Sequence, residues 1–292
     1  MTASNAARFI KDKHRIAANF SKAAAGYDSF AQFQQTVGER LLENLPVMKI
    51  RPAWFADLGS GTGRVAEVLL KIYPGSRGIQ MDLAVNMLRR ARPRWPWQRF
   101  RRSWVCADAE SLPMKDASVD LIASNLMLQW CNEPGRVMEE SFRVLRPGGL
   151  LIFSTLGPDT LHELRESWSA VDAEVHVNAF MDIHAVGTAL AAMGFSGAVL
   201  GTEKFTLTYN DGMALMRDLK RLGTGNTNAG RARSLTGKGR LAGMLQHYER
   251  FRQEGKLPAT YEIIYAHAWR QERQAPRARG TIAIPVSAIG RR

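Results

Sequence analysis

A glycine-rich turn after a short apolar run is the feature of the sequence most informative about chemistry. The turn reads Gly59-Ser60-Gly61-Thr62-Gly63 and follows Asp57-Leu58 at the end of the apolar run 53–58. Glycines allow positive φ angles and a close approach of a ligand to the backbone. The G-x-G-x-G spacing differs from the G-x-G-x-x-G of dinucleotide-binding turns, and the Asp57 carboxylate would repel a pyrophosphate. The turn therefore favours a nucleotide-like ligand that carries a positive charge and no phosphate.

Two further acids stand where the next strands are expected to end. Asp82 lies about twenty residues past the last glycine, where a carboxylate can accept hydrogen bonds from both ribose hydroxyls. Asp108 follows the third expected strand and can accept from an adenine amino group. Together with Asp57, which suits a cationic amino group, they predict S-adenosylmethionine as the cofactor. The predicted cofactor-binding residues are Asp57, Gly59, Ser60, Gly61, Gly63, Asp82, Leu83, Asp108, Ala109 and Asn125.

These residues must be positioned by alternating strands and helices. Short apolar runs predict buried strands at 53–58, 78–82, 104–107, 119–124 and 150–155, and stretches with helical spacing lie between them. This alternation predicts an α/β, Rossmann-like, doubly wound and mostly parallel sheet with right-handed crossovers. A helix is expected before it at 31–45, and the segment 146–149 is expected to be a turn because it contains Pro and Gly.

The chain changes character after Pro158. Helices are expected from there to about 171, at 183–193, at 213–222 and at 241–251, with strands at 205–209 and 261–266. The segment 223–239, rich in Gly, Asn, Thr and Arg, is expected to be mobile or ordered by a ligand.

The region 53–155 resembles the class I S-adenosylmethionine-dependent methyltransferases. Three motifs resemble, more narrowly, the malonyl-acyl-carrier-protein O-methyltransferase (BioC) family: residues 20–28, FSKAAAGYD; residues 125–130, NLMLQW; and residues 153–164, FSTLGPDTLHEL. Residues 215–220 and 257–262 extend the likeness to about Trp269. The resemblance implies methylation of the free carboxyl of malonyl-acyl-carrier protein, or of malonyl-CoA, early in biotin synthesis.

The chain is expected to divide into three parts. Residues 1–48 are expected to form an N-terminal helical cap that serves as a lid. Residues 49–269 are expected to form the methyltransferase domain, with a helical insertion near 211–255, and residues 270–292 a disordered basic tail.

The resemblance gives roles to several residues outside the glycine turn. Tyr27 is the candidate lid residue, and Gln129 and Trp130 are candidates for the wall of the acceptor pocket; these three are the predicted catalytic residues. A carboxyl acceptor is already ionised at pH 7, so no general base is expected. A cation should orient the acceptor carboxylate, and the candidates are Arg165, Arg217 and Lys220.

Composition bears on partners and compartment. The 40 Lys and Arg against 27 Asp and Glu give a net charge of +13, which suits an acidic partner such as an acyl carrier protein. The arginine-rich run from Arg89 to Arg102, which includes Trp95 and Trp97, is a candidate docking region. Two cysteines and the lack of a signal-like or membrane-spanning apolar run predict a cytoplasmic protein with no membrane partner. The histidine and cysteine spacing predicts no metal site.

Three other functions are compatible with parts of the sequence. Residues 159–165 and 258–261 also resemble a mitochondrial complex I assembly factor that hydroxylates a protein arginine on a methyltransferase-like fold, although Tyr27-Asp28 and Gln129-Trp130 favour the biotin enzymes. The positive charge suggests a nucleic-acid methyltransferase. That class needs a base-reactive element such as Asn-Pro-Pro-Tyr after the fourth strand, where Ser124-Asn125-Leu126 stands. The third alternative is a non-catalytic assembly protein that only binds the cofactor.

Overall fold

A seven-stranded sheet forms the centre of the protein in the computed structural model, which describes residues 10–93, 99–224, 227 and 237–271. The apolar runs form five parallel strands: β1 (Trp54–Leu58), β2 (Arg77–Asp82), β3 (Arg102–Cys106), β4 (Val119–Asn125) and β5 (Leu145–Leu156). The strand order is β3-β2-β1-β4-β5-β7-β6. The doubly wound, mostly parallel sheet predicted from the alternation of strands and helices is confirmed.

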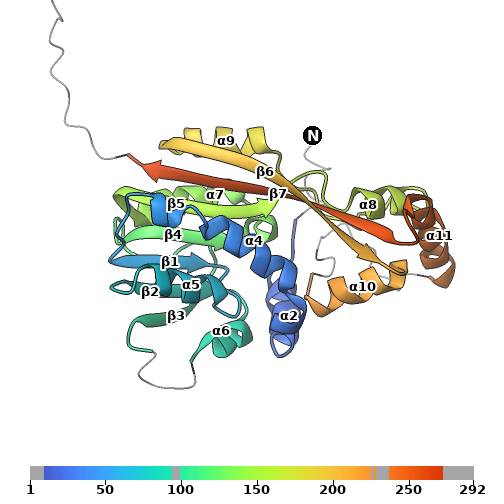
Figure 1. Cartoon of the computed structure of the whole chain (residues 1–292), viewed down its shortest axis with the longest axis horizontal. Coiled ribbons are helices and arrows are strands. Elements are labelled where there is room, and N and C mark those ends of the chain that lie inside the picture. The colour runs from blue at the N-terminus through green and yellow to red at the C-terminus, as the bar shows by residue number, and fades with distance from the viewer. Residues whose placement is uncertain (1–9, 94–98, 225–226, 228–236, 272–292) are drawn as a thin grey trace, which may run out of the picture.

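Two long strands complete the sheet on one side. β7 (Leu257–Arg270) lies antiparallel between β5 and β6 (Phe195–Tyr209), and the β6–β7 pair runs along the top of Figure 1. The predicted strands at 205–209 and 261–266 are only parts of these two. The sequence pattern does not reveal the first half of β6, because this half lies on an exposed edge of the sheet. Five of the residues 196–203 are polar, charged or Gly, so no apolar run marks the strand.

Two strand boundaries also differ from the expectation. The segment 146–149, expected as a turn, lies inside β5, where the pairing with β4 shifts register between Val119 and Leu121. The basic tail was expected to start at residue 270, but Arg270 is the last residue of β7. Its guanidinium donates to the carbonyl oxygen of Arg143 at 3.0 Å. The rest of that tail, 272–292, lies outside the described residues.

Helices cover both faces of the sheet (Figure 1). On one face α4 (Gln32–Leu42) and α5 (Arg64–Ile72) pack Leu41, Leu42 and Leu69 against Phe55 of β1. On the other face α7 (Pro134–Val144) and α9 (Ile183–Ala192) form a second apolar cluster with β4 and β5. The helix α6 (Val85–Ala91) connects β2 to β3. The parallel strands are thus buried on both sides, as their continuous apolar sequence requires.

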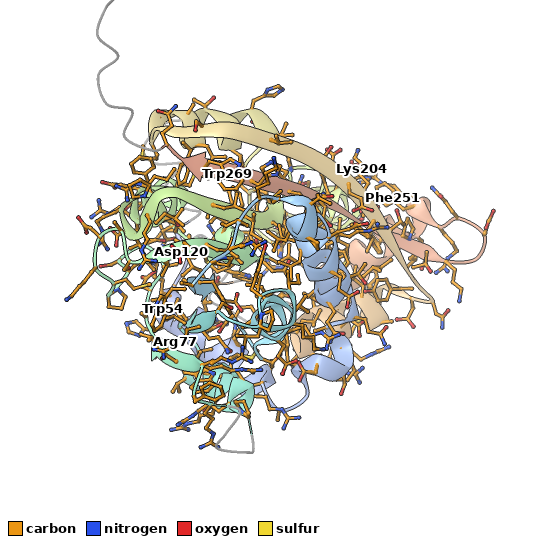
Figure 2. The ribbon with its side chains drawn as sticks, turned by 60° about the vertical axis from the view of Figure 1, so that its left-hand side comes forward. Trp54, Arg77, Asp120, Lys204, Phe251 and Trp269 are labelled. Carbon is orange, nitrogen blue, oxygen red and sulfur yellow. The ribbon has the colours of Figure 1, made fainter. Side chains whose placement is uncertain are left out.

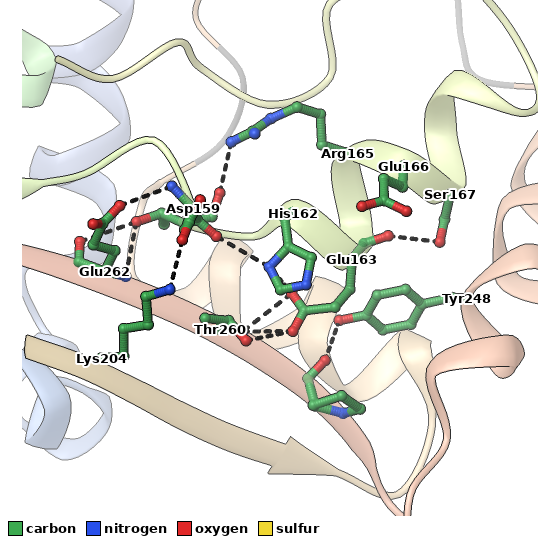
Figure 3. A network of polar contacts seen from close by, with 12 residues as sticks. Asp159, His162, Glu163, Arg165, Glu166, Ser167, Lys204, Tyr248, Thr260 and Glu262 are labelled. Atoms are coloured by element: carbon green, nitrogen blue, oxygen red, sulfur yellow. Dashed lines mark hydrogen bonds and ion pairs between the residues drawn. The ribbon is translucent and has the colours of Figure 1, made fainter. Parts of the chain in front are cut away.

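A third apolar cluster lies at the end of β6 and β7 remote from α9. There α8 (His162–Ser169), α10 (Gly212–Arg221) and α11 (Lys238–Tyr248) gather around the two strands (Figure 1). The short η4 (Glu249–Phe251) follows α11. The buried Glu163 fastens α8 to β7, because its Oε1 accepts from the backbone N–H of Thr260 at 3.1 Å and from the Thr260 hydroxyl (Figure 3). This cluster gives α8 and α10 a fixed position beside the ends of the parallel strands.

The N-terminal segment forms α2 (Lys13–Ala23) and the single turn α3 (Tyr27–Phe30). Asp12 caps α2 by accepting from the backbone N–H of Arg15 at 3.0 Å, and Asn86 of α6 donates to the carbonyl of Ser21 at 3.3 Å. The short helices η1 (Leu45–Val47) and η3 (Leu128–Trp130) follow α4 and β4. No helix among the described residues has the length and apolar character needed to cross a membrane. Nor do these residues include a group of three or more His, Cys, Asp or Glu side chains placed to hold a metal ion.

Candidate active site

A cavity of about 240 Å³ lies beyond the carboxyl ends of the parallel strands. The glycine turn, Asp82 and Asp108 line one end, and Leu164 of α8 and Tyr261 of β7 line the other. Ligands of doubly wound sheets bind at this edge, where the strand order reverses around the first strand. The cavity therefore joins a predicted cofactor end to a second end walled by the C-terminal half of the chain.

The glycine turn has the backbone conformation that its composition predicts. Gly59, Gly61 and Gly63 have φ angles of +69°, +52° and +87°. A Cβ at Gly59 would lie 2.4 Å from the Met127 Cγ, so glycine is required there for packing. At Gly61 no described atom lies within 4 Å of the corresponding Cβ position, and its N–H donates to the Asp82 Oδ2 at 2.9 Å. Gly61 thus offers open space for a ligand on a turn that the protein holds rigidly.

Asp57, predicted from the sequence to bind the cofactor, lies behind this turn and is not among the residues that line the cavity. Its side chain is buried, and Oδ2 accepts from the backbone N–H of Ala66 at 3.2 Å. Its Oδ1 has no hydrogen-bond partner among the described residues. Burial raises the pKa of Asp57 to about 7. Asp57 can therefore act on a ligand only through the electric field it exerts across the turn.

Asp82 and Leu83 lie at the end of β2 and both line the cavity. The two oxygens of Asp82 accept from the backbone N–H groups of Gly61 and Ala84 at 2.9 and 2.7 Å. A carboxylate has about four lone-pair sites, so two remain for ligand hydroxyls. Burial raises the pKa of Asp82, against these two backbone hydrogen bonds, which lower it.

Asp108 and Ala109 also line the cavity, but Asp108 already has a partner. Lys13 of α2 forms an ion pair with Asp108 at 2.5 Å and with Glu110 at 2.6 Å. The predicted adenine-binding carboxylate therefore also fastens the N-terminal segment across the cofactor end. Lys13 itself lines the cavity and was not predicted; a lone lysine near the N-terminus carries no recognisable signal in the sequence.

The predicted catalytic residues Tyr27, Gln129 and Trp130 all line the cavity. Burial, reinforced by Asp82 and Asp28, raises the pKa of Tyr27, so its hydroxyl stays protonated and can only donate or accept a hydrogen bond. The Gln129 amide donates to the carbonyl of Leu126 at 2.7 Å. The Trp130 ring meets Phe20 of α2 edge to face, with ring centres 5.2 Å apart. Side chains from α2, α3 and η3 thus close one side of the cavity together.

Asn125 ends β4 and also lines the cavity. Its Oδ1 accepts from the Ser154 hydroxyl at 2.7 Å, and its Nδ2 donates to the carbonyl of Gln34 at 2.9 Å. Asn125 therefore ties α4 to the sheet as well as facing the cavity.

The three predicted substrate-binding cations are not among the residues that line the cavity. Arg165 donates to the carbonyl of Thr160 at 2.7 Å (Figure 3). Arg217 and Lys220 are exposed on α10, and Arg217 lies 3.9 Å from Asp211. On these helices the leucines Leu164 and Leu219 face the cavity instead. The sequence showed the cations but not which face of each helix was turned inward.

The described part of the arginine-rich run lies mainly near the amino ends of the parallel strands, opposite to the carboxyl ends where the cavity lies. Arg101 and Arg102 stand where β3 begins, and Arg89 and Arg90 in the last turn of α6. That edge also holds Trp54, Arg77 and Asp120, labelled in Figure 2. β2 has six residues, so the two edges are separated by about 20 Å of strand. Residues 94–98, with Arg94, Trp95 and Trp97, lie outside the described residues.

The chain is similar to known methyltransferases in sequence. The family model described as a methyltransferase domain matches residues 56–153, which span β1 to β5. A malonyl-[acyl-carrier protein] O-methyltransferase from Gallionella capsiferriformans is 45% identical over 268 residues, which cover 90% of this chain and 92% of that protein. The chain belongs to the malonyl-acyl-carrier-protein O-methyltransferase family. This confirms the resemblance carried by residues 20–28, 125–130 and 153–164.

Two further proteins are similar to this chain, one in sequence and one in fold. The biotin biosynthesis bifunctional protein BioHC of Saccharophagus degradans is 42% identical over 261 residues, which cover 87% of this chain and 46% of that protein. A methyltransferase structure from Bacillus halodurans superposes with a TM-score of 0.59 at 15% identity, covering 81% of this chain and 99% of that one. The second likeness confirms the methyltransferase fold. The relatives do not favour the arginine-hydroxylase alternative.

Proposed function

We propose that this protein transfers the methyl group of S-adenosylmethionine to the free carboxyl of a malonyl thioester on acyl carrier protein, in the early part of biotin synthesis. The observation that carries the proposal is the 45% sequence identity to a malonyl-[acyl-carrier protein] O-methyltransferase. The alignment covers 90% of this chain and 92% of that relative. The cavity supports it, because one continuous space joins the glycine turn to Gln129 and Trp130. The composition further supports a cytoplasmic location.

The cofactor end has the groups that an adenosyl sulfonium needs. Gly61 leaves open space, Asp82 retains lone pairs for ribose hydroxyls, and Ala109 and Leu83 offer apolar contact. The Ser60 hydroxyl and the Gln34 Oε1 are buried without a hydrogen-bond partner in the described residues, and both residues line the cavity. When bound, S-adenosylmethionine supplies an electrophilic methyl group on its sulfonium. The residues present fit this cofactor.

The second end of the cavity, lined by Leu164 and Tyr261, is called the acceptor end. It has to orient a nucleophile rather than generate one. A malonyl carboxylate is ionised at neutral pH, so the protein needs no group to remove a proton. Tyr27 has its pKa raised by burial and stays neutral, which suits a lid residue that donates a hydrogen bond and excludes water. Gln129 and Trp130 are fixed by Leu126 and Phe20, so the acceptor meets a wall that is already in place.

The acceptor partner is proposed to be acyl carrier protein, with malonyl-CoA as the alternative carrier. An acidic carrier suits a chain of net charge +13. Docking at the Arg89 to Arg102 region stays a prediction. It would bring the carrier to the amino ends of the parallel strands, whereas the cavity lies beyond their carboxyl ends.

Mass spectrometry of malonyl-acyl-carrier protein incubated with methyl-labelled S-adenosylmethionine tests the proposal. A labelled methyl ester on the malonyl group is expected. Genetic rescue of a biotin-requiring strain that lacks this methyltransferase is the matching test in cells, with Asp57→Ala as a non-rescuing control. Absence of the ester from purified protein that binds the cofactor would refute the proposed function. Turnover on a protein arginine or on RNA would instead support the alternatives.

A further inference from the structure

His176 is a histidine at the acceptor end of the cavity that neither the glycine-turn motif nor the three family motifs include. It lies in the segment between α8 and α9 and lines the cavity together with Val177, and its side chain is only 15% exposed. Its imidazole ring stacks on the buried Trp168 of α8, with ring centres 3.7 Å apart and planes 6° apart. The stack fixes the plane of the ring at the cavity wall.

An acid fixes the rotation of the ring within that plane. His176 Nε2 lies 2.8 Å from Asp172 Oδ1, and the other oxygen of Asp172 pairs with Arg240 of α11 at 3.2 Å. Burial acts to raise the pKa of Asp172, but the His176 hydrogen bond and the neighbouring charges outweigh it and lower this pKa. Asp172 is therefore ionised and can hold a protonated imidazole. The remaining ring nitrogen, Nδ1, has no hydrogen-bond partner in the described part of the chain.

The other cations that line the cavity serve elsewhere. Lys13 is paired with Asp108 and Glu110 at the cofactor end. Arg64 begins the helix after the glycine turn, is 51% exposed and lies 3.5 Å from Glu39. Of the cavity residues that can be positively charged, His176 is thus the one that the described structure places among the acceptor-end side chains.

We propose that His176, oriented by Asp172 and Trp168, binds the carboxylate of the acceptor through Nδ1. The inference rests on the proposed function. It names a cation inside the cavity, where Arg165, Arg217 and Lys220 are not among the lining residues. A neutral ring whose Nε2–H donates to Asp172 would present a lone pair at Nδ1, which repels a carboxylate. An imidazolium presents a second N–H there, so it can donate to Asp172 through Nε2 and to the arriving carboxylate through Nδ1 at the same time.

This arrangement distinguishes the acceptor from its product. An imidazolium forms an ion pair with a carboxylate, in which both partners of the hydrogen bond are charged, whereas it meets only a neutral acceptor oxygen in a methyl ester. His176 therefore binds the substrate more tightly than the product, which favours release of the ester. Because a carboxylate has two oxygens, one can be held by His176 while the other attacks the methyl group.

Discrimination between malonyl and acetyl groups tests the inference, because the two acyl groups differ by the carboxylate. KM for malonyl-acyl-carrier protein and the inhibition constant of acetyl-acyl-carrier protein are measured for the wild type and for His176→Phe, which keeps a ring to stack on Trp168. The variant is expected to raise KM about 10- to 100-fold, the range that loss of a charged hydrogen bond gives. The acetyl inhibition constant and the affinity for S-adenosylmethionine are expected to stay unchanged.

Two further variants separate binding from a merely structural role. Asp172→Asn, which keeps the histidine but removes its ionised partner, is expected to raise KM for the malonyl carrier in the same direction. His184→Ala, at an exposed histidine of α9, is expected to change nothing. An unchanged malonyl KM in His176→Phe, or a parallel loss of malonyl and acetyl binding, would overturn the inference. A wild type that forms no methyl ester would instead overturn the proposed function.

Discussion

Asp57 is the residue through which pH should control cofactor binding. Burial raises its pKa to about 7, so below that pH the free protein carries a proton there. A cationic ligand on the far side of the turn favours the carboxylate and lowers this pKa, so binding below pH 7 requires loss of the proton. We predict that affinity for S-adenosylmethionine, measured by calorimetry, rises about fivefold from pH 6 to pH 7.2.

The matched variant for this prediction is Asp57→Asn, which keeps the shape and removes the titration. Its affinity is expected to be weaker at pH 7.2 and nearly independent of pH over the same interval. The amino group of the ligand itself titrates near pH 8, so both measurements stay below that value. A wild type and an Asp57→Asn variant with the same pH dependence would show that Asp57 does not act through the turn.

Gly59 and Gly61 have similar backbone conformations but different surroundings, so alanine at each should have different effects. At Gly61 only the positive φ is strained, and Gly61→Ala should lower the free energy of unfolding by about 1 kcal/mol. The added methyl group occupies ligand space, so affinity for S-adenosylmethionine should fall at least about tenfold. Gly59→Ala adds an overlap with Met127 and should destabilise the fold by a further 1 to 3 kcal/mol, roughly. Thermal melts and cofactor titrations of both variants check this, and normal cofactor affinity in Gly61→Ala would contradict it.

Among the elements, α2 is the one whose attachment should control access to the cofactor end. Lys13 joins it to Asp108 and Glu110, and these three side chains are only 13 to 31% exposed. We predict that Lys13→Met speeds dissociation of S-adenosylmethionine about threefold, because partly exposed ion pairs contribute about 1 kcal/mol or less. Stopped-flow displacement measures this rate, and hydrogen exchange over residues 13–23 should increase with it. Arg15→Ala on the same helix is the control, and an equal effect there would attribute the change to α2 stability alone.

The elements also show how far the sequence predicts the fold. The five parallel strands were identifiable because both faces are buried, which leaves continuous apolar runs such as 119–124. The first half of β6 was not, since its residues are mostly exposed. The residues 146–149 suggested a turn through Pro147 and two glycines, yet the register shift between β4 and β5 accommodates them within a strand.

The site was predictable where chemistry and chain position coincide. Gly61 and Asp82 belong to strand ends that the sheet necessarily brings to one edge, and Tyr27, Gln129 and Trp130 came from the resemblance. Lys13 and His176 were not predictable, because each lies far along the chain from the strand ends it joins at the cavity. For a related reason the sequence does not show that Leu219, rather than Arg217 or Lys220, lines the cavity: local spacing does not tell which face of α10 packs inward when the partner element is unknown.

For the whole molecule, the question is where an acidic carrier delivers its acyl arm. Two exposed basic surfaces compete. One is the end of α6 with Arg89, Arg90 and Arg92, from which the chain continues to the start of β3 at the edge opposite the cavity. The other is the outer face of α10 with Arg217, Lys220 and Arg221, and the inner face of this helix supplies Leu219 to the cavity wall. The second surface adjoins the acceptor end.

We therefore predict that charge reversal on α10 impairs the carrier-bound substrate more than charge reversal on α6. Arg217→Glu combined with Lys220→Glu should raise KM for malonyl-acyl-carrier protein about tenfold at low ionic strength and less at high salt, because exposed charges are screened. Arg89→Glu combined with Arg90→Glu is the matched control with the same change in net charge. A larger effect from the α6 pair would move the docking site to the Arg89 to Arg102 region. Equal effects would mean that net charge alone steers the carrier, since a site-specific surface must distinguish two variants of identical charge.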